Sequence, residues 1–372
     1  MILAKKHLLD ALTLLNSGFG RTSDLTIKFG EEVCTLTSLD PTLTISIGVP
    51  VDNKDNLPGK ELRIQIEKLQ GFLKGISDDK VEFKEEKKTH AVKGASSKIK
   101  QPFSAEKQPE MEELDPEKGH VAFPNSLILC SLAKALMPII RGSINTIMLG
   151  AHVKTENNKV LIHGTDSFRL ARVEYSADEI ETVGEMDIIL PLQALIVLER
   201  FGGNEDPVLL IAHDNKYQID LSDGDLTVTL VGPQVAGTYP AVDALLTSEP
   251  KLEFEIGSTE LTQKCKLHRA TAMSERTLHG KFESKSDTLF ISTLSTTSIN
   301  SSIEEGFKKT TGEGELDVTL TFKYMLDAIA LVAVAGSEKI KLGLSDETKF
   351  VWIRPCDETE GLKIACVIAP VG

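Results

Sequence analysis

The sequence predicts an α+β fold built from three similar modules, each with two helices packed on antiparallel sheets. Strand-like segments end at three landmarks that are 126 and 129 residues apart: Asp40, Asp166 and Ser295. Helical segments begin at three further landmarks that are 126 and 130 residues apart: Ile64, Leu190 and Leu320. Because two separately chosen sets of landmarks keep the same period, the chain is expected to repeat one unit of helix, strands, helix and strands.

The first helix of each module is predicted from apolar residues that share one helical face. These residues are Leu8, Leu12 and Leu15, then Ile128, Leu132, Leu136 and Ile139, then Leu261, Cys265 and Ala272. Asn125 or Ser126 is expected to cap the second of these helices, and Ser258 or Thr259 the third. Between the helices lie alternating strand-like runs, and Asp223-Gly224-Asp225 is expected to join two of them as a hairpin.

The charged stretch from 78 to 119 can be interpreted in two ways. Its composition suggests a solvated linker. The repeat instead requires it to supply the last strands of the first module, at Lys80 to Lys84, Ala91 to Lys93 and Ile99 to Phe103. We favour the strands.

Composition places the chain among ordinary globular proteins. It has 372 residues, a net charge of −14, 41% hydrophobic and 26% charged residues, which excludes collagen-like and wholly disordered classes. The apolar run from Leu127 to Ile140 is too short to span a membrane, and the first residues lack the order of a secretory signal. A cytoplasmic location and buried free thiols at the five cysteines are expected.

Signatures of catalysis are missing. There is no G-x-S-x-G, Walker A or H-E-x-x-H pattern. Cys265 and His268 share a helix face, but two residues do not make a zinc site. The carboxylates of Asp223 and Asp225 are better explained by a hairpin turn than by acid–base chemistry. We therefore expect no cofactor, no metal and no catalytic residue.

The segment Thr165-Asp166-x-x-Arg169-Leu170-Ala171 stands out, although alone it is consistent with a simple turn between two strands. It resembles the signature of the bacterial replicative sliding clamp, the β subunit of DNA polymerase III. The resemblance continues in register through four further segments: Leu190-Pro191, Gly237-Thr238-Tyr239-Pro240, Tyr324-Met325-Leu326-Asp327 and Val367-Ile368-Ala369-Pro370. Together these segments span most of the chain from the second module to the end.

The resemblance implies three clamp domains, at 1–119, 120–247 and 248–372, and a head-to-tail homodimer that closes into a ring. Such a ring encircles double-stranded DNA without reading its sequence and tethers the replicative polymerase, so the protein is expected to be a non-catalytic processivity factor. The implied partners are DNA, a second copy of the chain, DNA polymerase, the clamp loader and repair proteins that carry clamp-binding peptides. An acidic exterior suits a ring that must slide.

The resemblance also assigns sites. DNA-facing cations would be Arg21, Lys134, Arg141, Arg200, Lys264, Lys266, Arg269 and Lys323. A peptide-binding cleft between the second and third domains would include Met148, Thr165, Phe168, Arg169, Leu170, Pro240, Leu245, Val367, Ile368, Pro370 and Val371. The dimer interface would join Ile99 or Phe103 to Ala272 and Met273.

The cleft departs from the usual family pattern at three places. Ser167-Phe168 replaces Gly-His, Asp243-Ala244 replaces a commonly basic pair, and the end Pro370-Val371-Gly372 lacks a Met-Arg character. Two other functions stay open. One is a β-rich interaction or structural protein related to clamps that does not encircle DNA. The other is an enzyme that uses Asp166 and Arg169, which is disfavoured because no base or nucleophile accompanies them.

Overall fold

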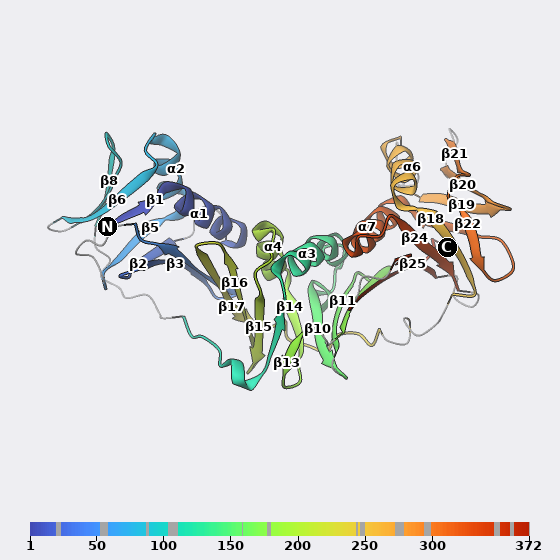
Figure 1. Cartoon of the computed structure of the whole chain (residues 1–372), viewed down its shortest axis with the longest axis horizontal. Helices are drawn as coiled ribbons and strands as arrows, with labels where there is room; N and C mark the ends of the chain where they lie inside the picture. The colour runs from blue at the N-terminus through green and yellow to red at the C-terminus, as the bar shows by residue number, and fades with distance from the viewer. Residues whose placement is uncertain are drawn as a thin grey trace. The chain divides into compact units, whose positions relative to one another are not determined.

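The computed structural model describes residues 1–371 except 20–23, 53–58, 87–88, 103–110, 158, 177–179, 243–244, 246–249, 272–278, 294–298, 346–349 and 358–360. Its elements run three times through one order: a strand, a helix, four or five strands, a second helix and three strands (Figure 1). We call these passes repeats 1, 2 and 3.

Repeat 1 contains β1 (Ile2–Ala4), α1 (Lys5–Phe19), β2 (Asp24–Phe29), β3 (Val33–Asp40), β4 (Leu43–Pro50), β5 (Glu61–Gln65), α2 (Ile66–Gly75), β6 (Lys80–Glu86), β7 (Thr89–Lys93) and β8 (Lys98–Pro102). Repeat 2, after a 3-10 turn at Pro116–Lys118, contains β9 (His120–Phe123), α3 (Ser126–Ile140), the 3-10 turn η2 (Thr146–Met148), β10 (Gly150–Glu156), β11 (Lys159–Thr165), β12 (Arg169–Ser176), β13 (Glu181–Val183), β14 (Asp187–Pro191), α4 (Leu192–Phe201), β15 (Val208–His213), β16 (Lys216–Asp223) and β17 (Leu226–Pro233). Repeat 3 contains β18 (Leu252–Gly257), α6 (Ser258–Ala270), β19 (His279–Lys285), β20 (Thr288–Thr293), β21 (Asn300–Ile303), β22 (Lys308–Thr311), β23 (Asp317–Thr321), α7 (Phe322–Val332), a 3-10 turn (Ala333–Ala335), β24 (Lys339–Leu344), β25 (Val351–Pro355) and β26 (Leu362–Ile368).

The predicted repeat is confirmed, with one systematic correction. The second helices begin at Ile66, Leu192 and Phe322, two residues later than predicted in every repeat, and keep the 126- and 130-residue spacing. The offset arises because β5, β14 and β23 continue to the residue just before each helix. The apolar residues taken as helix starts therefore belong to strands, where alternate side chains also face a core.

The charged stretch of repeat 1 folds as strands. β6, β7 and β8 pair in succession, with Phe83 opposite Val92 and Val92 opposite Ile99. The linker alternative is wrong for residues 80–86, 89–93 and 98–102, because β6 buries Val81 and Phe83 and β7 buries His90, Ala91 and Val92 despite the high charge of the stretch. Phe103 lies outside the described residues.

Two local predictions at turns and caps also have clear outcomes. The hairpin at Asp223 is confirmed, since Asp223 pairs with Leu226 across a two-residue turn in which Gly224 has a φ of 57°. The carboxamide of Asn125 accepts a hydrogen bond from the Ile128 amide, as expected for a cap. The prediction for α6 is wrong, because Gly257 takes the cap position and the Ser258 hydroxyl instead donates to the carbonyl of Glu338.

Contacts divide the chain into two compact units, and repeat 2 contributes to both. Unit 1 comprises residues 1–130, 180–186 and 193–234. It holds a nine-stranded antiparallel sheet in the order β13-β9-β15-β16-β17-β4-β3-β2-β5 and a four-stranded sheet, β1-β6-β7-β8. α1 packs on β3 and β4, contacts α2, and has its C-terminal turn close to Val197 of α4.

Unit 2 comprises residues 131–179, 187–192 and 235–372. Its nine-stranded sheet has the order β14-β10-β11-β12-β26-β25-β24-β18-β22, and its smaller sheet has the order β21-β20-β19-β23. α7 packs on β25 and β26 and contacts α6. The end of α3 lies over β11, where a Cβ on Gly164 would meet Leu136 and Ile140.

Both large sheets are assembled by the same rule. In unit 1 the last strand of repeat 2, β17, pairs with the third strand after the first helix of repeat 1, β4. In unit 2 the last strand of repeat 3, β26, pairs with the equivalent strand of repeat 2, β12. Each sheet is therefore continuous across a boundary between repeats, held by backbone hydrogen bonds.

The surroundings of the five cysteines do not favour reactive thiolates. Cys34, Cys130, Cys265 and Cys366 are buried and Cys356 is half-buried, and all five are free thiols as predicted. Burial raises the pKa of Cys34 and Cys356 to about 11 and that of the other three to about 12. In the described part of the chain no helix is long and apolar enough to cross a membrane.

The packing of Gly280 against α7 generates a test of the unit 2 core. A Cβ on this β19 residue would lie 2.1 Å from Cζ of Phe322, whose ring is fully buried between His268 and Phe282. We expect Gly280→Ala to destabilise the protein by about 1–3 kcal/mol, because the enclosed ring cannot move away. Thermal denaturation followed by circular dichroism measures the change.

Gly71 of α2 is the matched control, since nothing lies within 4 Å of its Cβ position. Gly71→Ala should leave the melting temperature unchanged or raise it, because alanine favours the helix. A Gly280→Ala protein as stable as the unaltered one would contradict the packing described.

Candidate functional site

The turn between β11 and β12 is held by the side chains of Thr165 and Asp166. The Thr165 hydroxyl donates to the carbonyl of Arg169 and accepts from the amide of Ser167. One carboxylate oxygen of Asp166 accepts from the amides of Phe168 and Arg169 at 3.0 Å. Asp166 is 4% exposed, so these bonds replace the water that it loses. The turn is consequently rigid, although Ser167 has a φ of 76°.

The side chain of Arg169 is fully buried and joins three elements. Its Nε donates to Asp166 at 3.0 Å, its Nη1 to Asp327 of α7 at 2.5 Å, and its Nη2 to the carbonyl of Pro138 in α3 at 2.7 Å. The guanidinium also lies 4.2 Å from the ring centroid of Tyr324. The planar guanidinium presents its N–H donors in a fixed geometry and bonds all three acceptors at once, which the ammonium group of a lysine could not do. Arg169 thus fixes α3, α7 and the turn relative to one another.

The next residue of β12 faces the opposite side of the sheet. Leu170 pairs with Val367 of β26, and Val367 pairs with Trp352 of β25. These three side chains belong to one buried apolar cluster, which Tyr239 and Val242 from the segment after β17 complete together with Ile189. The segment after β17 therefore covers part of this face of the sheet, where the ring of Tyr239 stacks on His152 of β10 at 4.7 Å and Gly237 lies against Ile147 of η2.

Phe168 forms an exposed apolar rim beside this turn. Its side chain is 58% exposed and its ring is stacked 6.4 Å from that of Tyr324. The hydroxyl of Ser167 lies 3.4 Å from the sulfur of Met148. The chain end follows the same rim, because the Ala369 amide donates to the carbonyl of Phe168 and the Val371 amide to that of Thr319. The rim therefore joins η2, the turn, the chain end and α7.

The structure brings most of the predicted cleft residues to this turn or to its two neighbouring strands. Thr165, Arg169, Leu170, Val367 and Ile368 are buried, so they shape the site from beneath its surface. Met148, Pro240, Pro370 and Val371 are half-buried, and Leu245 is 40% exposed. Asp243 and Ala244 lie outside the described residues.

The helices carry a net positive charge because acidic residues are scarce on them. The helices α1, α2, α3, α4, α6 and α7 carry ten Lys and Arg residues and five Asp and Glu residues. Their net charge is +5 in a chain whose net charge is −14, so all other residues together carry −19. Lys134, Arg141, Arg200, Lys266, Arg269 and Lys323 are exposed and Lys264 is half-buried.

None of these seven cations has an ion-pair partner among the residues that the structure describes. They are free to meet an external anion. Arg21, the other predicted DNA-facing residue, lies outside the described residues, as do Phe103, Ala272 and Met273 of the predicted dimer interface. Ile99 is half-buried in β8, the edge strand of the smaller sheet of unit 1.

Comparison with known proteins agrees with this geometry. Residues 134–241 match the family model of the DNA polymerase III beta subunit, central domain. The Helicobacter pylori beta clamp bound to a DNA ligase peptide superposes with a TM-score of 0.83 at 18% identity over 100% of both chains. The chain has the fold of a bacterial β sliding clamp. The Bacillus subtilis DNA polymerase sliding clamp gives 0.83 at 18% identity, and the Thermotoga maritima DNA polymerase III beta subunit gives 0.80 at 16%.

Each of the latter two matches covers 100% of this chain and 98% of the other. No curated protein sequence matches the chain. The clamp fold therefore extends over the whole chain, and the family model of the central domain matches its middle part.

Sequence reasoning missed the partners of Arg169. Asp327 and Tyr324 were recognised as part of a family segment but not as contacts of the motif 158 residues earlier. One signal pointed to Asp327, because it is the only acidic residue of α7, a mainly apolar helix that also carries Lys323. Among the described residues, no three His, Cys, Asp or Glu side chains gather as they would to hold a metal ion.

The Arg169 network generates a stability test. Arg169→Ala would leave the carboxylates of Asp166 and Asp327 without their cation, and we expect a loss of about 3–5 kcal/mol. Urea denaturation followed by the emission of Trp352, the only tryptophan of the chain, measures this in unit 2. Lys323→Ala, which removes an exposed cation of the same helix, should cost no more than about 0.5 kcal/mol. Equal stability of the two variants would contradict the structural role of Arg169.

Proposed function

We propose that this protein is a non-catalytic DNA sliding clamp that acts as a homodimeric ring in the cytoplasm. The observation that carries the proposal is the rule by which the repeats join. A last strand, β17 or β26, pairs with a third strand, β4 or β12. The three repeats contain three last strands, β8, β17 and β26, and three third strands, β4, β12 and β21. In the described chain two strands of each kind are paired in this way.

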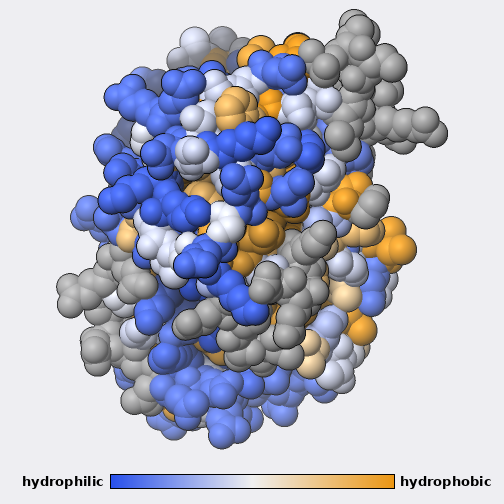
Figure 2. All heavy atoms as spheres, turned by 90° about the vertical axis from the view of Figure 1, so that its right-hand side faces the viewer, coloured by the Kyte–Doolittle hydropathy of each residue, from blue (hydrophilic) through white to orange (hydrophobic). Residues whose placement is uncertain are grey.

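The two remaining strands are the edges β8 and β21. β8 ends the smaller sheet of unit 1, and β21 begins that of unit 2. In the described part of the chain each has one neighbouring strand only. Figure 2 shows the face of unit 2 that carries β20 to β22, where apolar side chains lie among hydrophilic ones. Open edges tend to pair, and β8 of one copy pairing with β21 of another continues the rule.

Two such pairings join two copies head to tail, so three domains per chain, at 1–119, 120–247 and 248–372, give a ring of six. Its helices supply the positive charge that DNA requires. Contacts between lysine or arginine and phosphates are independent of sequence and weaken with salt, which suits a protein that must slide. The fold similarity to bacterial clamps over the full chain supports the same function.

The ring generates the first functional test. We expect a mass of about 81 kDa in solution, twice the 40.6 kDa of one chain. After loading by a bacterial clamp loader, the protein should stay on nicked circular DNA through a gel-filtration column and leave when the circle is cut. A ring is retained by topology, so linearisation and not salt should release it. Equal retention on circles and linear DNA would contradict encirclement.

A variant tests whether the helix cations contact DNA. Replacing Lys264, Lys266 and Arg269 of α6 with glutamate should weaken retention, because a charge of +3 in the helix becomes −3. The matched control replaces Lys285, Lys308 and Lys309, which lie on strands, in the same way. The control should keep normal retention, and equal losses in both variants would contradict a DNA-facing role for α6.

Partner docking at the rim of Phe168 is the second part of the proposal. The departure from the usual histidine puts a large exposed aromatic ring at this position, next to Tyr324 and the chain end. Exposed aromatic side chains that cluster with apolar neighbours are common anchors of interfaces. An extended peptide can bury apolar side chains against Phe168, Met148 and Pro370 while its backbone pairs with the chain end.

The docking proposal is tested with the DNA ligase peptide that the Helicobacter pylori clamp binds. Phe168→Ala should weaken its binding at least about tenfold in fluorescence anisotropy, with an unchanged melting temperature. Phe290→Ala, which removes another exposed phenylalanine of unit 2, is the control and should bind normally. No binding to the unaltered protein, or equal binding by the two variants, would contradict the assignment.

A further inference from the structure

A row of basic side chains crosses the large sheet of unit 2, on the face opposite the Arg169 guanidinium. The printed register runs through His152, His163, Arg172 and Ala365 on four neighbouring strands, and it pairs Arg354 with Lys341 on the next two. Continuing the β25·β26 register by one residue beyond Ile353 and Cys366 places Arg354 opposite Ala365. Neighbouring strands are about 4.8 Å apart, so these side chains lie next to one another. Five of the six residues are histidine, arginine or lysine.

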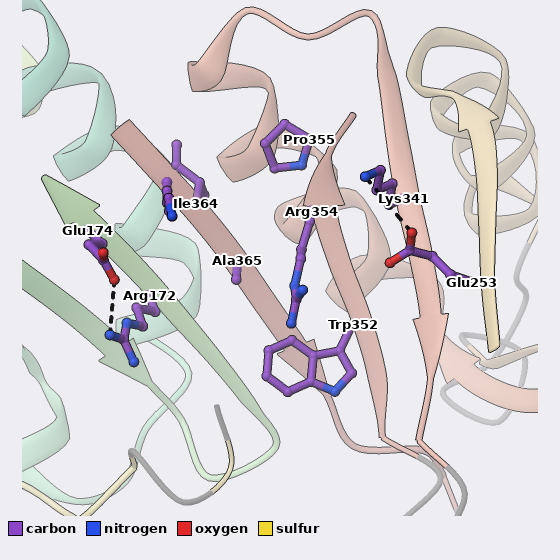
Figure 3. A pocket seen from close by; sticks show the side chains of 10 residues that line it. Arg172, Glu174, Glu253, Lys341, Trp352, Arg354, Pro355, Ile364 and Ala365 are labelled. Atoms are coloured by element: carbon purple, nitrogen blue, oxygen red, sulfur yellow. Dashed lines mark hydrogen bonds and ion pairs between the residues drawn. The ribbon is translucent and has the colours of Figure 1, made fainter. Parts of the chain in front are cut away.

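The small side chain of Ala365 leaves a hollow in the middle of this row. The hollow has a volume of about 350 Å³ and is flanked by Arg172 on one side and by Arg354 and Trp352 on the other (Figure 3). The Arg354 guanidinium lies 4.6 Å from the Trp352 ring centroid. Figure 3 shows Lys341 and Glu253 at the far side, facing one another. We call this hollow the Ala365 pocket.

The pocket carries a net positive charge. Four cations line it, namely Arg172, Lys341, Arg354 and Lys363, against the two carboxylates of Glu174 and Glu253. Glu174 is already bonded by Lys159 at 2.6 Å and Arg172 at 3.1 Å. Burial opposes its ionisation, but the Lys159 bond and the two positive charges hold the pKa of Glu174 below its usual value. It therefore stays charged at neutral pH, and the lining carries +2.

Arg354 is the cation that lacks a counter-ion. It is half-buried, and among the described residues no carboxylate lies within ion-pair distance of it. Lys341 has only a long contact of 4.0 Å to Glu253. A guanidinium without a counter-ion, placed over an indole ring, keeps its N–H donors available, and its planar fork is suited to bidentate binding of a carboxylate.

The pocket adjoins the apolar cluster beneath the Phe168 turn. Leu170 precedes Arg172 by two residues on β12, and Val367 follows Ala365 by two residues on β26. Two residues of extended chain span roughly 7 Å. Trp352 belongs to both the cluster and the pocket. The rim residue Phe168 precedes Arg172 by four residues, or roughly 13 Å of extended chain. A partner segment of several residues is therefore long enough to run from the rim to the pocket.

We propose that the Ala365 pocket binds acidic side chains of the partner segment whose apolar residues dock at the Phe168 rim. This inference rests on the proposed docking function and adds a charge preference to it. Arg354 and Arg172 bind the carboxylates, and Glu174 and Glu253 at the border repel a continuous polyanion such as nucleic acid. The pocket selects partners with aspartate or glutamate next to their apolar anchors.

Trp352 provides a direct readout because it is the only tryptophan of the chain and stacks with Arg354. The probes are a tryptophan-free peptide with two leucines flanked by four glutamates, its glutamine counterpart, and inorganic phosphate. The glutamate peptide should change the emission of the full-length protein saturably and bind at least about tenfold more tightly than the glutamine peptide. Arg354→Gln should abolish this preference.

Lys285→Gln is the matched control, because Lys285 also lies over an aromatic ring, that of Phe290, away from the pocket. It should keep the preference for glutamate. Equal binding of the two peptides, or a preference that survives Arg354→Gln, would overturn the inference. Phosphate that competes fully at the concentration of the peptide would show a general anion site and would also overturn it.

A failure of the docking proposal has a different signature. Phe168→Ala would then leave the binding of the glutamine peptide unchanged, while Arg354→Gln would still decide the charge preference. Loss of affinity for both peptides in Phe168→Ala, with a retained ratio between them, is the expected outcome.

Discussion

Backbone pairing between sheet edges is the constraint on which the whole molecule depends. A repeat of this kind ends in strands whose outer amides and carbonyls need partners, and in a packed protein few such groups stay unpaired. The chain meets this need twice by extending one repeat's sheet with the next, at β4·β17 and at β12·β26. The same constraint, applied to β8 and β21, leads from the fold of one chain to an assembly of two.

The two junctions between repeats have the same strand pairing but differ in the side chain at the start of the third strand. β4 begins at Leu43 and β12 begins at Arg169, and both strands have eight residues. Leu43 is buried and would contact a Cβ at Gly18, near the end of α1. Arg169 instead binds the end of α3 and reaches α7. The apolar contact shows that the topology does not require a buried ion network.

A network of this kind rarely adds net stability over an apolar core, but it specifies one arrangement. Arg169 holds the turn of Ser167 and Phe168 and the helix that presents Tyr324. The exposed rim is thereby fixed in position before any partner arrives, which lowers the entropic cost of binding. The Arg169 network thus fixes the backbone of the turn, whereas the exposed side chains that the turn presents, Ser167 and Phe168, differ from the usual family pattern.

The sequence predicted the elements where a period was visible and failed where contacts were distant. The threefold order, the strands within the charged stretch and the hairpin at Asp223 all followed from spacing and alternation. The starts of the second helices were placed two residues early because a buried strand residue and a buried helix residue look alike. The Gly257 cap was missed because Ser258 is the better capping residue by preference alone.

Distant contacts leave no local pattern. Arg169 and Asp327 are 158 residues apart, and nothing in either segment names the other. The basic row of the Ala365 pocket is equally hidden, since its members come from strands of repeats 2 and 3 and become neighbours only through the pairing of β12 with β26. Such sites could be derived from sequence only after the register of that junction was known.

Charge is divided within the chain in a way that suits topological retention. A ring held on DNA by tight binding could not slide, so its positive charge must be sufficient to tolerate phosphates and too weak to fix them. The helices carry +5 and the remaining residues −19, so the residues outside the helices, taken together, repel DNA. A positive pocket on the sheet face works against this division. The pocket is compatible with sliding because Glu174 and Glu253 border it and limit it to a short ligand. A few carboxylates of a protein partner therefore fit the pocket better than a nucleic acid does.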